Sequence, residues 1–263
     1  MSSKLVIVTG ASGAVGQSFI EHFLQEEDTS CVAVSRSPMD TEALHCQADL
    51  LDRQSVEEHI NQIDLANVDD VILIHGVGKF KYESECEVTS SDATGEEVDE
   101  EIFSSNYHTF VNIAEPLIEK LNQAHEQGAK TTLALCGFGS ITDKYKIPFW
   151  RSYTYAKDTL RDYIKKLAKS SEWQGLIRGR FINVSTTDTG NENKLRPYAT
   201  AEEKKYWLKP ETVVNKAIAT LESLTPLWQE IDIYEPLPGF SPKEYYNNHQ
   251  EIQAKWQRQT GIS

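Results

Sequence analysis

The sequence predicts a doubly wound α/β fold, a three-layer arrangement in which helices cover both faces of a parallel sheet. Seven short apolar runs alternate with longer amphipathic stretches along the 263 residues. This alternation is typical of parallel strands joined by helical crossovers. A glycine-rich turn follows the first apolar run. The length suits one continuous core and is cramped for two, so residues 1–263 are interpreted as a single domain.

The seven apolar runs are the predicted strands of this sheet. They cover residues 4–8, 31–35, 44–48, 71–75, 131–136, 176–184 and 230–234. Right-handed crossovers between such strands place a ligand at their carboxyl ends, near the point where the strand order reverses. Amphipathic runs predict helices between them, among them residues 15–24, 97–122 and 149–169.

The turn after the first strand contains Gly10, Gly13 and Gly16. In a strand–turn–helix unit the first glycine allows a tight turn, the second lets backbone N–H groups approach a pyrophosphate, and the third lets the helix pack against the strand. The unpaired N–H groups and the dipole of the helix N-terminus favour an anion there. The sequence therefore predicts a dinucleotide site that consists of Gly10, Ser12, Gly13, Ala14, Val15 and Gly16.

The end of the second strand bears on which dinucleotide binds. An acidic side chain there would accept a hydrogen bond from the ribose 2′-hydroxyl of NAD. The sequence instead has Ser35 followed by Arg36. A guanidinium suits a phosphate by charge and by its bidentate geometry, so NADP(H) is the predicted cofactor and NAD(H) the alternative.

Composition argues against several other classes of protein. Subtracting 40 acidic residues from 26 basic ones gives a net charge of −14, whereas nucleic acids and anionic membranes attract basic surfaces. No apolar run approaches the roughly 18 residues of a membrane span, and the N-terminus leads directly into a predicted strand. Cys31, Cys46, Cys86 and Cys136 form no CxxC pair, so we expect reduced thiols, no metal site and a cytoplasmic location.

Three segments stand apart from the alternating pattern. Residues 82–101 contain nine carboxylates and no Lys or Arg, which favours a solvated connection over a cation or partner site. Residues 188–209 form a long polar stretch where a substrate lid would lie. Residues 236–263 form a C-terminal extension with a predicted helix over 243–258, which would cover either the active site or a subunit interface.

Tyr153 and Lys157 are four residues apart, a spacing that places both side chains on one face of a helix. Ser140 lies thirteen residues before Tyr153, and Asn106 lies in the preceding long helix. In combination with the glycine turn, this order resembles the short-chain dehydrogenase/reductase family over residues 4–234. The resemblance implies a Rossmann fold and a catalytic tetrad of Asn106, Ser140, Tyr153 and Lys157.

The same resemblance implies further contacts to the cofactor. Asp49, with Leu50, matches the contact of the family to the adenine ring. His75, Gly76 and Val77 stand where the family has an Asn-Asn-Ala-Gly turn, and His75 itself is interpreted as a hydrogen-bonded structural histidine. Val184 and Thr186 match the segment that faces the nicotinamide, although the usual Pro-Gly is replaced by Asn-Val. The glycine spacing GxxGxxG is that of the larger, extended branch of the family, whose C-terminal domain the chain lacks.

A carbonyl that accepts a hydride develops negative charge on oxygen, which Tyr153 and Ser140 would stabilise and protonate. An ammonium at Lys157 is expected to lower the pKa of Tyr153. The resemblance implies that Lys157 also holds the nicotinamide ribose and that Asn106 keeps a water in a proton relay.

The predicted function is interconversion of a carbonyl and an alcohol by an NADP(H)-dependent oxidoreductase. The substrate is expected to be a small apolar or aromatic molecule, because aromatic residues flank the pocket, namely Phe138, Tyr145, Phe149, Trp150, Tyr198 and Trp207. An epimerase or dehydratase with tightly bound NAD, or a catalytically silent dinucleotide-binding regulator or scaffold, is the alternative. The resemblance also implies a homodimer or homotetramer formed through helices 97–122 and 149–169.

Overall fold

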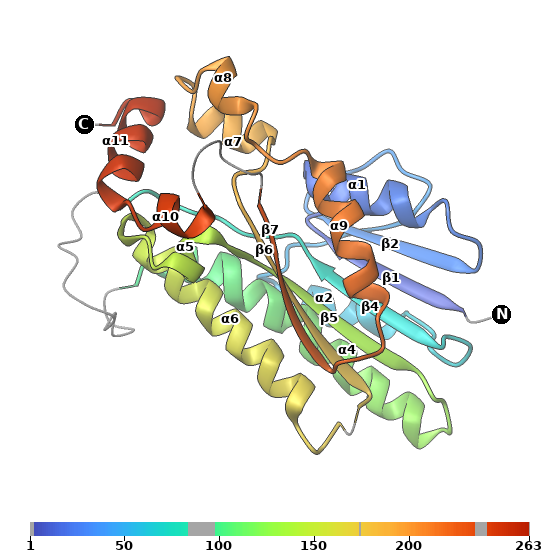
Figure 1. Cartoon of the computed structure of the whole chain (residues 1–263). Helices are drawn as coiled ribbons and strands as arrows, with labels where there is room; N and C mark the ends of the chain where they lie inside the picture. The colour runs from blue at the N-terminus through green and yellow to red at the C-terminus, as the bar shows by residue number, and fades with distance from the viewer. Residues whose placement is uncertain (1–2, 84–97, 174, 235–240, 263) are drawn as a thin grey trace.

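The computed structural model describes residues 3–83, 98–173, 175–234 and 241–262. Its centre is a seven-stranded sheet in the order β3-β2-β1-β4-β5-β6-β7, in which every neighbouring pair is parallel. Helices cover both faces (Figure 1). The order reverses between β1 and β4, as in doubly wound sheets. The predicted doubly wound α/β fold is confirmed.

All seven predicted strands are present, with ends that differ from the prediction by a few residues. They are β1 (Lys4–Thr9), β2 (Thr29–Ser35), β3 (Leu44–Gln47), β4 (Asp70–His75), β5 (Thr132–Ser140), β6 (Ile177–Val184) and β7 (Trp228–Ile233). The main difference is β5, predicted to end at Cys136, which runs to Ser140 because Phe138 and Gly139 pair with Ile182 and Asn183 of β6.

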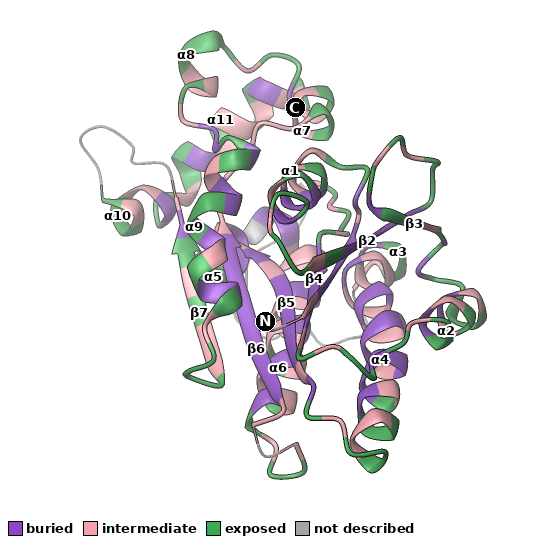
Figure 2. Ribbon diagram, turned by 90° about the vertical axis from the view of Figure 1, so that its right-hand side faces the viewer, coloured by how far each residue is buried: buried purple, intermediate pink, exposed green. Residues whose placement is uncertain are grey.

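Two apolar clusters hold the helices against the sheet. On one face lie α1 (Ala14–Phe23) and α9 (Pro210–Glu222). On the other lie α2 (Arg53–Asn61), α4 (Thr109–Glu126) and α6 (Arg151–Lys169). Figure 2 shows that buried residues concentrate in the central strands and on the inward sides of the helices. Central strands that helices cover on both faces have continuous apolar sequences, and this is why they could be predicted from the sequence.

The predicted helix over 97–122 is interrupted, and its first residue lies outside the described part of the chain. It consists of α3 (Glu100–Phe103), a π-helical turn η2 (Ser104–His108) and α4. The predicted helix over 149–169 begins as a 3₁₀ turn, η3 (Pro148–Trp150), before α6. Single π-turns inside helices are often found at functional sites.

The lid segment, residues 188–209, contains two short helices, α7 (Gly190–Leu195) and α8 (Ala201–Lys204). The predicted helix over 243–258 is two helices, α10 (Pro242–Tyr246) and α11 (His249–Thr260). The break falls at Asn248, whose side chain accepts a hydrogen bond from the backbone N–H of Glu251 and so starts a new helix. The lid and these helices lie together at one end of the sheet, next to α5 (Ile141–Tyr145) (Figure 1).

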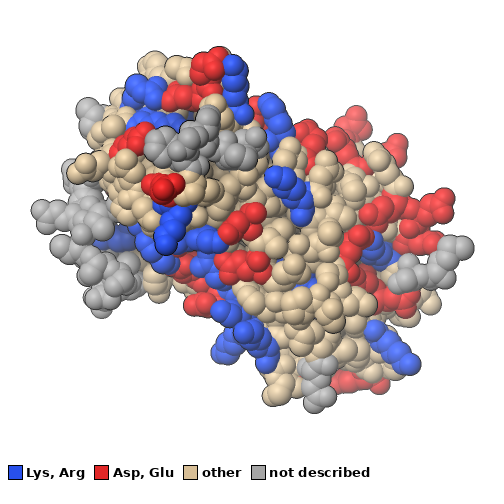
Figure 3. Space-filling view, viewed as in Figure 1, with Lys and Arg blue, Asp and Glu red and all other residues tan. Residues whose placement is uncertain are grey.

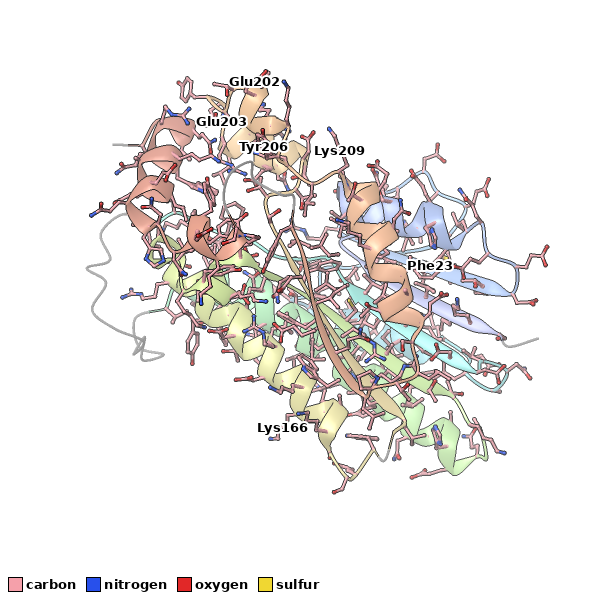
Figure 4. All side chains as sticks on the ribbon, in the orientation of Figure 1. Phe23, Lys166, Glu202, Glu203, Tyr206 and Lys209 are labelled. Carbon is pink, nitrogen blue, oxygen red and sulfur yellow. The ribbon has the colours of Figure 1, made fainter. Side chains whose placement is uncertain are left out.

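Direct contacts join the lid segment to the C-terminal helices. The Tyr198 backbone N–H donates to the carbonyl of Gln259 at 3.1 Å, and Glu203 pairs with Arg258. Figure 4 shows Glu203 and Tyr206 on this upper part of the molecule. The C-terminal extension, from residue 241 onward, therefore folds back onto its own chain at the lid.

The surface carries charges of both signs. Figure 3 shows acidic side chains gathered on the right-hand side of the face in view and mixed charges elsewhere. Within the four described ranges, no helix is both long enough and apolar enough to cross a membrane. Most of the acidic segment 82–101 lies outside the described residues.

Candidate active site

Ser140, Tyr153 and Lys157 meet at one end of the sheet. Ser140 is the last residue of β5, and its side chain caps α5. Tyr153 and Lys157 lie one turn apart on α6, and Ser140 lies close enough to the Tyr153 hydroxyl to lower its pKa. The Lys157 ammonium lies 5.4 Å from the centre of the Tyr153 ring. The structure thus brings together the three residues that the sequence suggested.

Burial perturbs both ionisable groups of this trio. It lowers the pKa of Lys157 to about 8, against the opposing charge of Asp143. Burial also raises the pKa of Tyr153, and the charges of Asp143 and Glu192 raise it further, whereas the nearby Ser140 side chain lowers it. The expected lowering of the Tyr153 pKa by Lys157 is wrong for this structure, because burial is the dominant effect and the ammonium lies over the ring.

Asn106, on the π-helical turn η2, is completely buried. Its Nδ2 donates to the carbonyls of Lys79 at 2.6 Å and Ile102 at 2.7 Å. Its Oδ1 has no hydrogen-bond partner among the described residues. A Cβ atom on Gly78 would lie 2.6 Å from this oxygen and 3.3 Å from Lys157 Nζ, so only glycine lets the chain pass between Asn106 and Lys157.

The glycine turn fits a bound pyrophosphate. Gly10 has a φ of +66°, and a Cβ there would lie 2.8 Å from the Gly76 carbonyl oxygen. A Cβ on Gly16 would lie 2.4 Å from the Gly10 carbonyl oxygen. Gly13 begins α1 with no side-chain cap, so the first N–H groups of the helix point outward unpaired. Ser12 and Gly13 are exposed, and Ala14 and Val15 are half-buried.

Residues at the ends of β2 and β3 surround the expected adenosine position. Ser35 Oγ donates to the Ser37 carbonyl at 2.6 Å and lies 3.0 Å from His45 Nε2. The exposed Arg36 side chain forms no ion pair with any described acidic residue, and its carbonyl accepts from Gln47 at 3.0 Å.

Of the two residues predicted to contact the adenine ring, one is exposed and the other is buried. Asp49 is exposed, and its Oδ1 accepts from the Leu51 backbone N–H at 3.0 Å. Leu50 is buried in the core between the sheet and α2, and its carbonyl accepts from Asn112 at 2.8 Å. The side chain of Leu50 therefore does not face the cleft.

His75 is buried in the core and is hydrogen-bonded there through both ring nitrogens. Its Nδ1 shares a 2.8 Å hydrogen bond with Thr9 Oγ1, and its Nε2 lies 3.2 Å from Thr109 Oγ1. Burial and the charge of Lys157 lower its pKa to about 3, so the ring stays neutral. This geometry agrees with the structural interpretation of His75. The neighbouring Gly76 and Val77 pack against the Gly10 turn.

A cavity of about 200 Å³ opens over Ser140 and Tyr153. Val184 and Thr186, after β6, line it as well. Its aromatic walls come from segments far apart in the sequence, and include Phe80, Trp150, Tyr206, Trp207, Tyr246 and Trp256. The described part of the C-terminal extension, α10 and α11, therefore forms part of the wall of this cavity.

The predicted aromatic wall was only partly right. Of the six residues named from the sequence, Trp150 and Trp207 line the cavity. Phe138 instead packs against Phe19 beneath the sheet, with ring centres 6.0 Å apart, and Tyr198 is 65% exposed. Sequence order alone cannot tell which side of a strand or loop an aromatic ring faces.

A buried charge network beneath Ser140 was missed altogether. Asp143 is completely buried, its Oδ1 accepts from the Ser140 backbone N–H at 2.5 Å, and its Oδ2 pairs with Arg161. Burial raises the pKa of Asp143 to about 6, and Arg161 opposes that rise. The guanidinium lies 4.8 Å from the ring centre of Phe181. The spacing from Ser140 to Asp143 matches a capping box and was the available signal.

A parallel sheet with a glycine turn after its first strand defines the class of dinucleotide-binding α/β proteins. The family model of the short chain dehydrogenases matches residues 4–199. The chain therefore belongs to the short chain dehydrogenase family, whose members are oxidoreductases with a nicotinamide dinucleotide cofactor. No curated protein matches the sequence.

Solved structures show the same fold at low sequence identity. The ligand-free aldohexose dehydrogenase of Thermoplasma acidophilum has a TM-score of 0.69 at 18% identity, over 92% of this chain and 98% of its own. A short chain dehydrogenase from Burkholderia cenocepacia in complex with NADP has a TM-score of 0.66 at 15% identity, over 97% and 98%. A 4-hydroxyisoleucine dehydrogenase complexed with NADH has a TM-score of 0.65 at 15% identity, over 91% and 100%.

Proposed function

We propose that this protein is an NADP(H)-dependent carbonyl reductase, which interconverts a carbonyl and an alcohol. The observation that carries the proposal is the meeting of Ser140, Tyr153 and Lys157 beneath a cavity that Val184 and Thr186 also line. A small molecule in this cavity would lie against the hydroxyls of Ser140 and Tyr153, with Lys157 buried next to Tyr153 and not itself part of the cavity lining.

In the proposed reaction the bound dinucleotide supplies the hydride. Ser140 and Tyr153 hold the carbonyl oxygen and donate hydrogen bonds to the negative charge that develops on it. Tyr153 then transfers its proton to this oxygen as a general acid. Its raised pKa supports this direction, because the phenol keeps its proton until the alkoxide forms.

Lys157 and Asn106 restore the proton of Tyr153 in this scheme. The pKa of Lys157, about 8, lies near neutral pH, so its ammonium exchanges protons readily. The unpartnered Oδ1 of Asn106 and Lys157 Nζ both lie next to Gly78. This oxygen is suited to hold a water that carries protons to Lys157.

The residues proposed to bind the cofactor lie along the carboxyl ends of the strands. The glycine turn holds the pyrophosphate, and Asp49 contacts the adenine. Lys157 holds the nicotinamide ribose, and Val184 with Thr186 faces the nicotinamide. Arg36 pairs with a 2′-phosphate, which favours NADP(H) over NAD(H). Neighbours complexed with NADP and with NADH both occur, so this preference rests on Arg36 alone.

NADPH absorbance measured over a panel of aromatic and aliphatic carbonyls tests the proposal. A reductase consumes NADPH in equal amount to the alcohol that it forms. Substrate conversion without net consumption would instead indicate an epimerase or dehydratase. Cofactor binding without turnover of any carbonyl would indicate a silent regulator or scaffold, and either result would overturn the proposed reduction.

The family fold and composition support two further proposals. We propose a homodimer or homotetramer formed through the helical stretch α3–η2–α4 and through α6, which carry the half-buried Phe103, Tyr107 and Tyr155. We also propose a cytoplasmic location, because the described Cys31, Cys46 and Cys136 are free thiols.

A further inference from the structure

The cavity wall contains aromatic residues, several Ser and Thr hydroxyls and four charged side chains, two of which are the half-buried Glu203 and Lys255. Glu192 and Arg196, one turn apart on and just after α7, both line the cavity and form an ion pair. Their side chains are only 12% and 2% exposed. Burying two charges is costly, and a well-packed apolar pair would often be at least as stable. Stability alone therefore gives little reason for a charged pair in this wall.

Arg196 packs against two aromatic rings. Its guanidinium lies 4.5 Å from the ring centre of Trp207 on the lid and 4.2 Å from that of Trp256 on α11. Its Nη1 donates to Gln259 Oε1 at 3.2 Å. Stacking on two indoles and a hydrogen bond at one edge fix the direction of the guanidinium. Arg196 therefore fixes the carboxylate of Glu192 as well.

One carboxylate oxygen of Glu192 is able to accept a further hydrogen bond. Arg196 Nη2 pairs with Oε1, and Oε2 forms no hydrogen bond with the described residues. The carboxylate also lies within electrostatic reach of Tyr153, whose pKa it raises. An acceptor thus stands in the same cavity as the hydroxyl pair that takes the carbonyl oxygen. It can bind only a group that carries a hydrogen to donate.

The charge balance narrows the class of substrate. Glu192 and Arg196 neutralise each other, Glu203 pairs with Arg258, and the half-buried Lys255 donates to the Tyr245 hydroxyl. A charged ligand next to the buried Glu192–Arg196 pair would therefore bring an unpaired charge into that part of the cavity. A neutral ligand with a hydroxyl group avoids this cost and satisfies Glu192. A plain ketone would leave Glu192 Oε2 without a hydrogen-bond donor, and sites of this kind discriminate strongly against ligands that lack the hydrogen-bonding group.

We propose that Glu192, oriented by Arg196, is a specificity-determining residue that accepts a hydrogen bond from a substrate hydroxyl, and that the substrates are neutral hydroxycarbonyl compounds. The inference rests on the proposed function in one respect, that the reacting carbonyl lies at Ser140 and Tyr153. The expected substrate then changes from a simple apolar or aromatic molecule to an apolar or aromatic molecule that carries a hydroxyl group close to its carbonyl.

Two ketones that differ in hydrogen-bond donation test this inference. 2-Hydroxyacetophenone donates a hydrogen bond next to its carbonyl, whereas 2-methoxyacetophenone only accepts one. The variant Glu192→Gln keeps an oxygen for Arg196 and turns an N–H₂ donor toward the ligand. Glu202→Gln is the matched control, because Glu202 is 80% exposed and pairs with Lys205. Figure 4 shows Glu202 on the upper part of the molecule.

We expect the wild type to prefer the hydroxyketone in kcat/KM, and Glu192→Gln to lower the ratio of hydroxyketone to methoxyketone by about ten- to a hundredfold. Glu202→Gln should leave the ratio unchanged. An unchanged ratio in Glu192→Gln, with both ketones reduced, would overturn the role of Glu192 and leave the reductase proposal standing.

Binding without turnover separates the two proposals. Trp207 and Trp256 lie at the cavity, so quenching of tryptophan fluorescence reports occupancy by the two product alcohols, 1-phenylethane-1,2-diol and 2-methoxy-1-phenylethanol. Tighter binding of the diol that is lost in Glu192→Gln supports the inference even if no ketone is reduced. Equal binding of both alcohols to the wild type contradicts it.

Discussion

Removing the Asp143 carboxylate should destabilise the protein and displace Ser140. Asp143 is completely buried, pairs with Arg161 and accepts from the Ser140 backbone N–H. Deleting one partner of a buried ion pair costs about 3–5 kcal/mol when the other charge is left unpaired. Arg161 keeps Asp158 at 2.5 Å and Glu230 at 3.2 Å, so we expect Asp143→Ala to cost about 3 kcal/mol, at the low end of that range.

Urea denaturation followed by circular dichroism measures this loss. With a slope of about 3 kcal/mol per molar urea, the midpoint should fall by about 1 M. Asp158→Ala is the matched control, because its carboxylate pairs with the same Arg161 but is 32% exposed, and such pairs contribute about 0–1 kcal/mol. Equal midpoint shifts in the two variants would refute the reasoning. At urea concentrations where the Asp143→Ala variant is still folded, it should also reduce ketones more slowly, because the Ser140 backbone N–H loses its hydrogen bond to Asp143.

Three further predictions concern the cofactor, the proton supply and assembly. Arg36→Ala should weaken NADPH binding by about tenfold or more and leave NADH almost unchanged, because a charge-assisted contact to phosphate is worth about 1.5–3 kcal/mol. Ser35→Asp should favour NADH. Titration of both cofactors tests this assignment, and it would be rejected if the wild type bound NADH and NADPH equally and Arg36→Ala changed neither affinity. The kcat/KM for reduction should fall as the pH rises through about 8, because Lys157 then loses the proton that it supplies to Tyr153. A flat pH–rate profile from pH 6 to 10 would exclude that role. Light scattering should give a dimer or tetramer at micromolar concentration, and a lone 29.8 kDa species would count against assembly through α4 and α6.

The sequence was sufficient for the fold because the relevant signals are local. Strands buried on both faces appear as apolar runs, and β1 with the Gly10 turn carries a nearly complete strand–turn–helix signature. The grouping of Ser140, Tyr153 and Lys157 followed from the order of motifs in the family. The ends of elements were less predictable, as at β5, whose extension to Ser140 depends on pairing with β6.

The chemistry of the cavity wall could not be predicted from the sequence, because it depends on contacts between distant segments. Arg196 and Trp256 are 60 residues apart in the printed sequence, and only the fold of the C-terminal helices stacks one on the other. The pKa of Tyr153 was predicted in the wrong direction for a similar reason. Helical spacing gave its distance from Lys157 along α6 but not its burial.

The reduction rate of Tyr153→Phe tests the central claim most directly. The substitution removes only the phenolic hydroxyl, which lies next to Ser140 in the cavity wall. The account predicts that kcat for a ketone that the wild type reduces falls by about a hundredfold or more, while the affinity for NADPH stays within about twofold. A variant that retained near wild-type kcat would contradict the assignment of Tyr153 as the proton donor, and with it the proposed active site.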